Sequence, residues 1–178
     1  MDRNIADRKI TALRIQKRNP NRVNIYLDGN FAFGLARIVA AWLRVGQILS
    51  PEKIAELQSE DEREVAYQRA LNSLQYRPRT QAEIRQNLAK AEFSEAVIAF
   101  VLERLQQNGL LNDRRFAESW IDNRSDLRPR SRYALAHELK QRGVAPEIIA
   151  ASLRWRAVCL RNIICSYREL YLQEIIIR

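Results

Sequence analysis

The chain has 178 residues, of which 47% are hydrophobic, and a formal net charge of +9 at pH 7. The longest apolar run covers residues 38–43, far short of the roughly 20 residues that a membrane helix needs, so the composition predicts a soluble protein with a packed core. The basic excess favours polyanions or an acidic protein surface as partners. Two cysteines, Cys159 and Cys165, make no disulfide framework, and the first residues carry no apolar signal segment, so we expect a cytoplasmic location.

The chain begins with the pattern of a small β unit, at residues 9–35. Apolar and polar residues alternate before and after a turn at residues 18–21, and Asp28-Gly29 between alternating runs predicts a type I′ hairpin turn. Residues 36–46 then change to a helical period, with Gly46 as a C-cap. Ser50 is a good N-cap for a following helix, and the acid-rich residues 59–64 suit the start of a further helix.

From about residue 61 the pattern is helical. We expect a first helix that ends near residue 77, a second over residues 80–91 and a third over residues 94–108. Thr80 and Glu83 predict a capping box at the start of the second helix.

This pattern repeats after 51 residues. Arg-Pro-Arg-Thr at residues 77–80 recurs as Arg-Pro-Arg-Ser at residues 128–131, and the apolar positions around it recur with the same spacing. Two three-helix units of about 50 residues each are therefore predicted, with Arg-Pro-Arg ending the first helix of each unit. The expected divisions are a β/α segment at 1–60, modules at 61–109 and 110–153, and a divergent or incomplete third module at 154–178.

Signals for catalysis are weak. His137 is the one histidine and is interpreted as a partly exposed structural residue; no phosphate-binding glycine loop, zinc-protease motif or paired CxxC occurs. No enzyme activity, cofactor or metal is predicted. Phe116 and Trp120 are interpreted as core residues.

Basic residues cluster around the repeated prolines and on the second helices. They fit either a solvated surface or a repeated cationic edge that faces a polyanion or an acidic protein groove. The candidates for such binding are Arg77, Arg79, Arg85, Arg128, Arg130, Arg132, Lys140 and Arg142.

The segments YRPRTQAEIRQNL, VLERLQQNGLLNDRRFAESWI and LRPRSRYALAHELKQRGVAP resemble RecX, the bacterial regulator of the RecA recombinase. The resemblance implies a mainly α protein of tandem three-helix, helix-turn-helix-like repeats in an elongated curved array, with a small N-terminal β-hairpin segment. It also implies a protein that binds RecA and the RecA–ssDNA filament, suppressing ATP hydrolysis and strand exchange, in recombination, DNA repair and the SOS response. We expect a monomer, because the apolar stripes of the helices are accounted for within the repeats. Whether such a protein caps the filament or blocks its groove stays open. The motif positions are Pro78, Thr80, Glu83, Gly109, Asp113, Phe116, Pro129, Ser131 and Gly143.

The sequence departs from the family pattern in two places. Glu92 stands where a glycine is usual, whereas the second unit keeps Gly143, which predicts a weaker helix end in the first unit. Residues 154–178 do not continue the repeat, and a frameshift or truncation is a hypothesis for that tail. An alternative function is direct DNA binding by the modules; their net charge of only +2, from 15 basic and 13 acidic residues in 61–153, argues against strong binding by this part.

Overall fold

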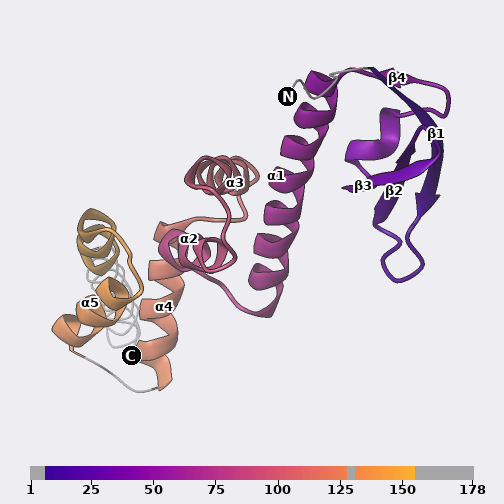
Figure 1. Cartoon of the computed structure of the whole chain (residues 1–178). Coiled ribbons are helices and arrows are strands. Elements are labelled where there is room, and N and C mark those ends of the chain that lie inside the picture. Colours follow the sequence, from indigo (N-terminus) through magenta and orange to yellow (C-terminus); the bar gives the residue numbers. More distant parts are fainter. Residues whose placement is uncertain (1–6, 128–130, 155–178) are drawn as a thin grey trace, which may run out of the picture. The chain divides into compact units, whose positions relative to one another are not determined.

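The computed structural model describes residues 7–127 and 131–154, with backbone alone for residues 125–127 (Figure 1). Two compact units are distinguished, an N-terminal unit drawn from residues 1–72 and 93–101 and a C-terminal unit drawn from residues 73–92 and 102–178. None of the helices within the described residues is long and apolar enough to cross a membrane. The chain has the predicted fold class, mainly helical with tandem three-helix domains behind an N-terminal antiparallel β segment.

The N-terminal unit begins with a sheet of four antiparallel strands within the described residues, in the order β3-β2-β1-β4. The strands are β1 (Arg8–Ile15), β2 (Arg22–Leu27), β3 (Asn30–Ala36) and β4 (Ile48–Leu49). The predicted turn between β2 and β3 is confirmed, since Asp28 and Gly29 both have positive φ, +51° and +84°. The two-residue strand β4, which pairs with β1 at Arg8 and Lys9, was too short to be predicted from its pattern.

The helix predicted for residues 36–46 is wrong. Only a 3₁₀ turn, η1 (Val39–Trp42), forms there, and within it Ala40 alone is buried. The chain must return to the edge of β1, where Gly46 donates its N–H to the Ile10 carbonyl oxygen at 2.8 Å. This pairing leaves no room for a full helix, and Trp42 remains 87% exposed.

A single helix, α1 (Pro51–Tyr76), follows the sheet, so the start of a further helix at residues 59–64 is a wrong prediction. Its 26 residues contain no glycine and no proline after Pro51, and nothing in the backbone interrupts the hydrogen-bond ladder. Ser50 accepts from the Lys53 N–H at 3.3 Å, which confirms the predicted N-cap. The sheet and the first half of α1 share one core, whose buried members are Ile10, Val23, Ile25, Leu27, Leu35, Ala40, Leu43, Leu49 and Leu57.

Asp61 of α1 binds the start of β2 and the end of β3 to this helix. Its carboxylate accepts from Arg22 Nη2 at 2.9 Å and from the Ala36 N–H, and its side chain is only 13% exposed. A charged pair that is mostly withdrawn from water is costly unless its hydrogen bonds are satisfied, and here both partners are present.

The remaining helices are short and match the predicted three-helix pattern. They are α2 (Gln81–Ala89), α3 (Glu95–Gln107), α4 (Asp113–Leu127) and α5 (Arg132–Gln141), followed by helical residues 146–154. Phe116 is buried, as predicted, while Trp120 is partly buried and stacks on Phe116 with ring centroids 5.9 Å apart. One hydrophobic cluster of the C-terminal unit has the buried members Phe116, Ala117, Ile121, Leu135, Leu139, Val144 and Ile149. The predicted third module falls almost wholly at residues 155–178, outside the described part.

Candidate functional site

The Arg-Pro-Arg sequence ends α1 as predicted. Arg79 folds back and donates from Nε to the Ser73 carbonyl oxygen at 3.0 Å, which satisfies one of the carbonyl groups that a helix end leaves without an intrahelical partner. Thr80 then caps α2 by accepting from the Glu83 N–H at 3.2 Å. In the second repeat, Ser131 accepts from the Ala134 N–H at 3.2 Å in the same way. The matching residues Arg128, Pro129 and Arg130 lie outside the described residues.

Thr80 does more than cap its own helix. It is fully buried, and its hydroxyl donates to the Arg142 carbonyl oxygen at 2.7 Å, across 62 residues of sequence. Asp113, the first residue of α4, accepts from the Gln81 N–H at 2.8 Å. Burial raises the pKa of the Asp113 carboxyl, the Gln81 N–H acts in the opposite direction, and the nearby Glu83 charge raises it further.

Glu83 is the centre of an ion-pair network in the C-terminal unit. Its carboxylate lies 3.0 Å from Arg77 Nη1 and 2.7 Å from Arg142 Nη1, and its side chain is 17% exposed. The hydroxyl half of the predicted capping box is thus confirmed, while the acid of the motif binds two arginines.

Arg142 also covers the indole of Trp120, with its guanidinium carbon 4.0 Å from the ring centroid. The same indole donates from Nε1 to Glu138 at 3.0 Å, and Arg124 lies over the ring at 4.8 Å. Cation–π contacts of this kind stabilise by about 0.5–2 kcal/mol, more when desolvated. Arg142 therefore links α2 to α4 as part of the packing.

The eight predicted cationic residues are thus divided by the structure. Arg79 and Arg142 are held by contacts within the C-terminal unit, and Arg77 is an ion-pair partner whose side chain is still 46% exposed. The exposed candidates are Arg85, Arg132 and Lys140. Arg128 and Arg130 lie outside the described residues.

Sequence reasoning missed the network that joins Glu83, Arg142, Trp120 and Glu138. Glu83 and Arg142 are 59 positions apart, and no local spacing marks such a pair. The nearest signal is a difference between the two repeats. Arg142 and Gly143 follow α5 at the positions that Ala91 and Glu92 occupy after α2, so an arginine stands in the second repeat where the first has an alanine.

A cavity of about 510 Å³ opens in the C-terminal unit at the starts of α2 and α4. Arg85 and Arg114 both line it, together with Asp113, Gln81 and Gly143. It therefore contains one of the predicted cationic residues and adds Arg114, which was not among them.

Three family models match successive parts of the chain. They are described as "Regulatory protein RecX N-terminal domain" at residues 8–50, "RecX, first three-helix domain" at residues 66–105 and "RecX, second three-helix domain" at residues 112–153.

Curated relatives agree with these matches. The Regulatory protein RecX of Clostridium perfringens (strain 13 / Type A) is 35% identical over 147 residues, which span 82% of this chain and 68% of that protein. The Regulatory protein RecX of Bacillus subtilis (strain 168) is 34% identical over 146 residues, 81% of this chain and 55% of that protein.

Solved structures give the same result. One described as "Crystal structure of regulatory protein RecX" is 29% identical with a TM-score of 0.73, covering 83% of this chain and 73% of that one. A second, "Crystal structure of RecX from Lactobacillus salivarius", is 25% identical with a TM-score of 0.53, covering 54% and 62%. The motifs, the fold and these relatives lead to one conclusion: the chain belongs to the RecX family of regulatory proteins.

Proposed function

We propose that the chain is a non-enzymatic modulator of the RecA recombinase, which binds the RecA–ssDNA filament and suppresses its ATP hydrolysis and strand exchange. The observation that carries the proposal is the match of RecX family models to the β segment and to both three-helix domains. Such a protein would act in the cytoplasm and restrain recombination, DNA repair and the SOS response.

The proposed contacts with the filament are the cationic residues that the packing leaves accessible. Arg132 and Lys140 lie exposed on α5, and Arg85 lies exposed on α2, so their charges can reach an acidic protein groove or a phosphate. Arg77 contributes its exposed part, whereas Arg79 and Arg142 are assigned to internal stabilisation. Arg128 and Arg130 remain candidates, because they are the repeat equivalents of Arg77 and Arg79.

The experiment is a titration of the chain into cognate RecA on single-stranded DNA, with the rate of ATP hydrolysis as the readout. We expect inhibition. Half-inhibition at far below one chain per RecA indicates action at filament ends, and half-inhibition near one to one indicates binding along the groove. If the folded chain leaves the rate unchanged at a molar excess, the proposed function is wrong.

A double charge reversal, Arg132→Glu with Lys140→Glu, tests the residue assignment. We expect about tenfold more protein to be needed for half-inhibition, since charged contacts in an interface each contribute roughly a kcal/mol or more. Arg115→Glu is a single-reversal control, because Arg115 is exposed on α4 and is outside the proposed set. Equal inhibition by the reversed and the wild-type chain, both folded by circular dichroism, would remove these two residues from the interface.

A further inference from the structure

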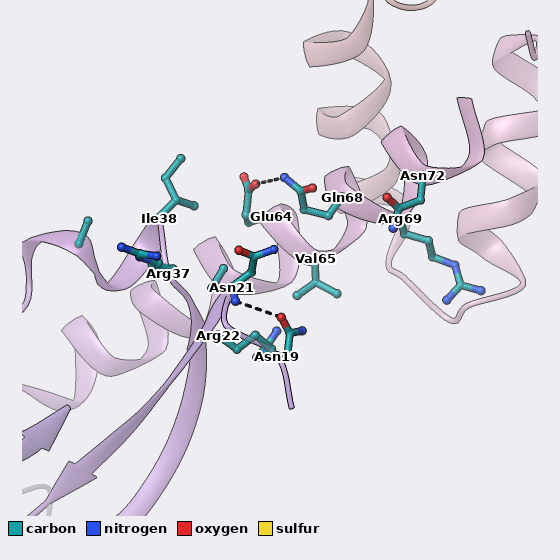
Figure 2. Close-up of a pocket in the computed structure, with 12 residues that line it drawn as sticks. Asn19, Asn21, Arg22, Arg37, Ile38, Glu64, Val65, Gln68, Arg69 and Asn72 are labelled. Atoms are coloured by element: carbon teal, nitrogen blue, oxygen red, sulfur yellow. Dashed lines mark hydrogen bonds between the residues drawn. The ribbon is translucent and has the colours of Figure 1, made fainter. Parts of the chain in front are cut away.

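The N-terminal unit contains an open pocket of about 840 Å³ between the sheet and α1 (Figure 2). Asn19 and Asn21 from the turn before β2 line it, Arg37 follows β3, and Gln68 and Arg69 come from α1. This volume is within the usual range of about 300–1,000 Å³ for ligand sites. We refer to it as the N-terminal pocket.

Charge is spread along this pocket and is not gathered at one point. Arg37 and Arg69 lie at opposite ends of the lining, with Asn21 and Gln68 between them (Figure 2). The acidic residue among the described lining, Glu64, is only 7% exposed and accepts from Gln68 Nε2 at 2.9 Å. Cations at both ends with amide donors between them suit an extended anionic chain better than a single small anion.

The β segment that supplies one side of this pocket is strongly basic, whereas residues 52–64 in the first half of α1 contain six acidic and two basic residues. Residues 8–50 contain eight Lys and Arg and one acid, Asp28, which gives 8 − 1 = +7, and that acid is already paired with Arg8 at 3.0 Å. The helical residues 61–153 carry only +2, from 15 basic and 13 acidic residues. The positive charge that attracts a polyanion is therefore concentrated in the β segment and not in the repeats.

An exposed aromatic side chain belongs to the same short segment as two pocket residues. Ile38 and Ala41 line the N-terminal pocket, and Trp42, the next residue, is 87% exposed. A tryptophan so open to water is an available platform for stacking an unpaired base, a contact that contributes about 1–3 kcal/mol per base. An acidic peptide has no base that could stack on this indole.

We propose that the N-terminal pocket binds single-stranded nucleic acid, with Arg37 and Arg69 on phosphates, Asn21 and Gln68 on sugars or base edges, and Trp42 stacked on a base. This contact is independent of RecA and separate from the cationic residues of the repeats. It goes beyond the proposed modulation of RecA, because the chain would bind single-stranded nucleic acid directly.

The test is fluorescence anisotropy of a labelled oligo(dT) of about 20 nucleotides with the full chain, without RecA, at a series of salt concentrations from about 50 mM upward. Wild type should bind with a steep salt dependence. Arg37→Glu should weaken binding at least about fivefold and reduce the slope of log affinity against log salt by about 1. Trp42→Ala should weaken it roughly five- to hundredfold while changing the slope little, since stacking moves no counterion. Arg115→Glu, with the same change of charge outside the N-terminal unit, should bind like wild type.

Four results would overturn the proposal. They are no binding by folded wild-type chain at the lowest salt, equal losses for Arg37→Glu and Arg115→Glu, unchanged binding by Trp42→Ala, and displacement of the oligonucleotide by poly-glutamate as readily as by unlabelled oligo(dT). The last would identify an acidic peptide as the occupant. Because RecA is absent from the assay, its outcome is independent of the result for ATP hydrolysis.

Discussion

The end of α5 provides a sharp test of the packing in the C-terminal unit. Gly143 has φ +76°, and the N–H of Val144 bonds to the Leu139 carbonyl oxygen at 3.1 Å, which is the six-residue closure of a Schellman motif. A Cβ added at Gly143 would overlap the Cβ of Ala82, near the start of α2. Two separate costs are therefore expected for Gly143→Ala, one from backbone conformation and one from steric overlap.

The two costs can be estimated separately. A non-glycine residue in the left-handed region costs about 1–2 kcal/mol, and overpacking a tight site costs about 1–3 kcal/mol. Gly143→Ala should thus destabilise the chain by about 2–5 kcal/mol. In an Ala82→Gly background the overlap disappears, so the same substitution should cost only about 1–2 kcal/mol.

The assay is urea unfolding of the four chains of this double-mutant cycle, followed by far-ultraviolet circular dichroism. Ala82→Gly alone should cost about 1 kcal/mol through helix propensity. The coupling between the two substitutions should then be about 1–3 kcal/mol in favour of the double variant. If Gly143→Ala costs the same in both backgrounds, the close approach of Gly143 to α2 is wrong.

Three further predictions concern single positions. Glu92 has φ +64°, so Glu92→Gly should raise the free energy of unfolding by about 0.5–1 kcal/mol. Glu103→Gly, at an exposed position inside α3, should lower it by about 1 kcal/mol. Both are read from urea midpoints, and a loss of stability in Glu92→Gly would contradict the positive φ of Glu92. Asp61→Ala removes the acceptor of the part-buried Arg22 guanidinium and of the Ala36 N–H, and should lower the free energy of unfolding by about 2–4 kcal/mol in thermal or urea unfolding. The control Glu62→Ala, at an exposed position, should lower it by less than about 0.5 kcal/mol. Similar losses for the two variants would show that the Asp61 contacts contribute little. Burial raises the pKa of Asp113 above its ordinary 3.8, so the contribution of this carboxyl to stability is complete below that pH and is lost as the pH rises through the raised folded pKa. Asp113→Asn lacks this loss, so the stability of the variant relative to wild type should increase between about pH 3 and pH 7. A difference in stability that stays constant with pH would exclude the pKa shift.

The local features of this protein follow from short stretches of its sequence. Asp28-Gly29 specified its hairpin turn because few residue pairs accept positive φ at both positions. Pro78 and Thr80 specified where one helix ends and the next begins, because proline restricts the residue before it and a threonine hydroxyl can cap an exposed N–H. The spacing of 51 residues then revealed the repeated domains, and with them the family.

Contacts between distant parts of the chain decide which local preferences prevail and which charged side chains are held within the fold. The apolar pattern around Trp42 has a helical period, yet pairing of β4 with β1 confines it to a 3₁₀ turn. Arg142 and Arg132 look alike in sequence, but Arg142 contacts Glu83 and Trp120 whereas Arg132 is exposed. Turns and caps depend on neighbouring residues, whereas strand pairing, ion pairs and burial join residues far apart in the chain. No short-range pattern encodes those contacts.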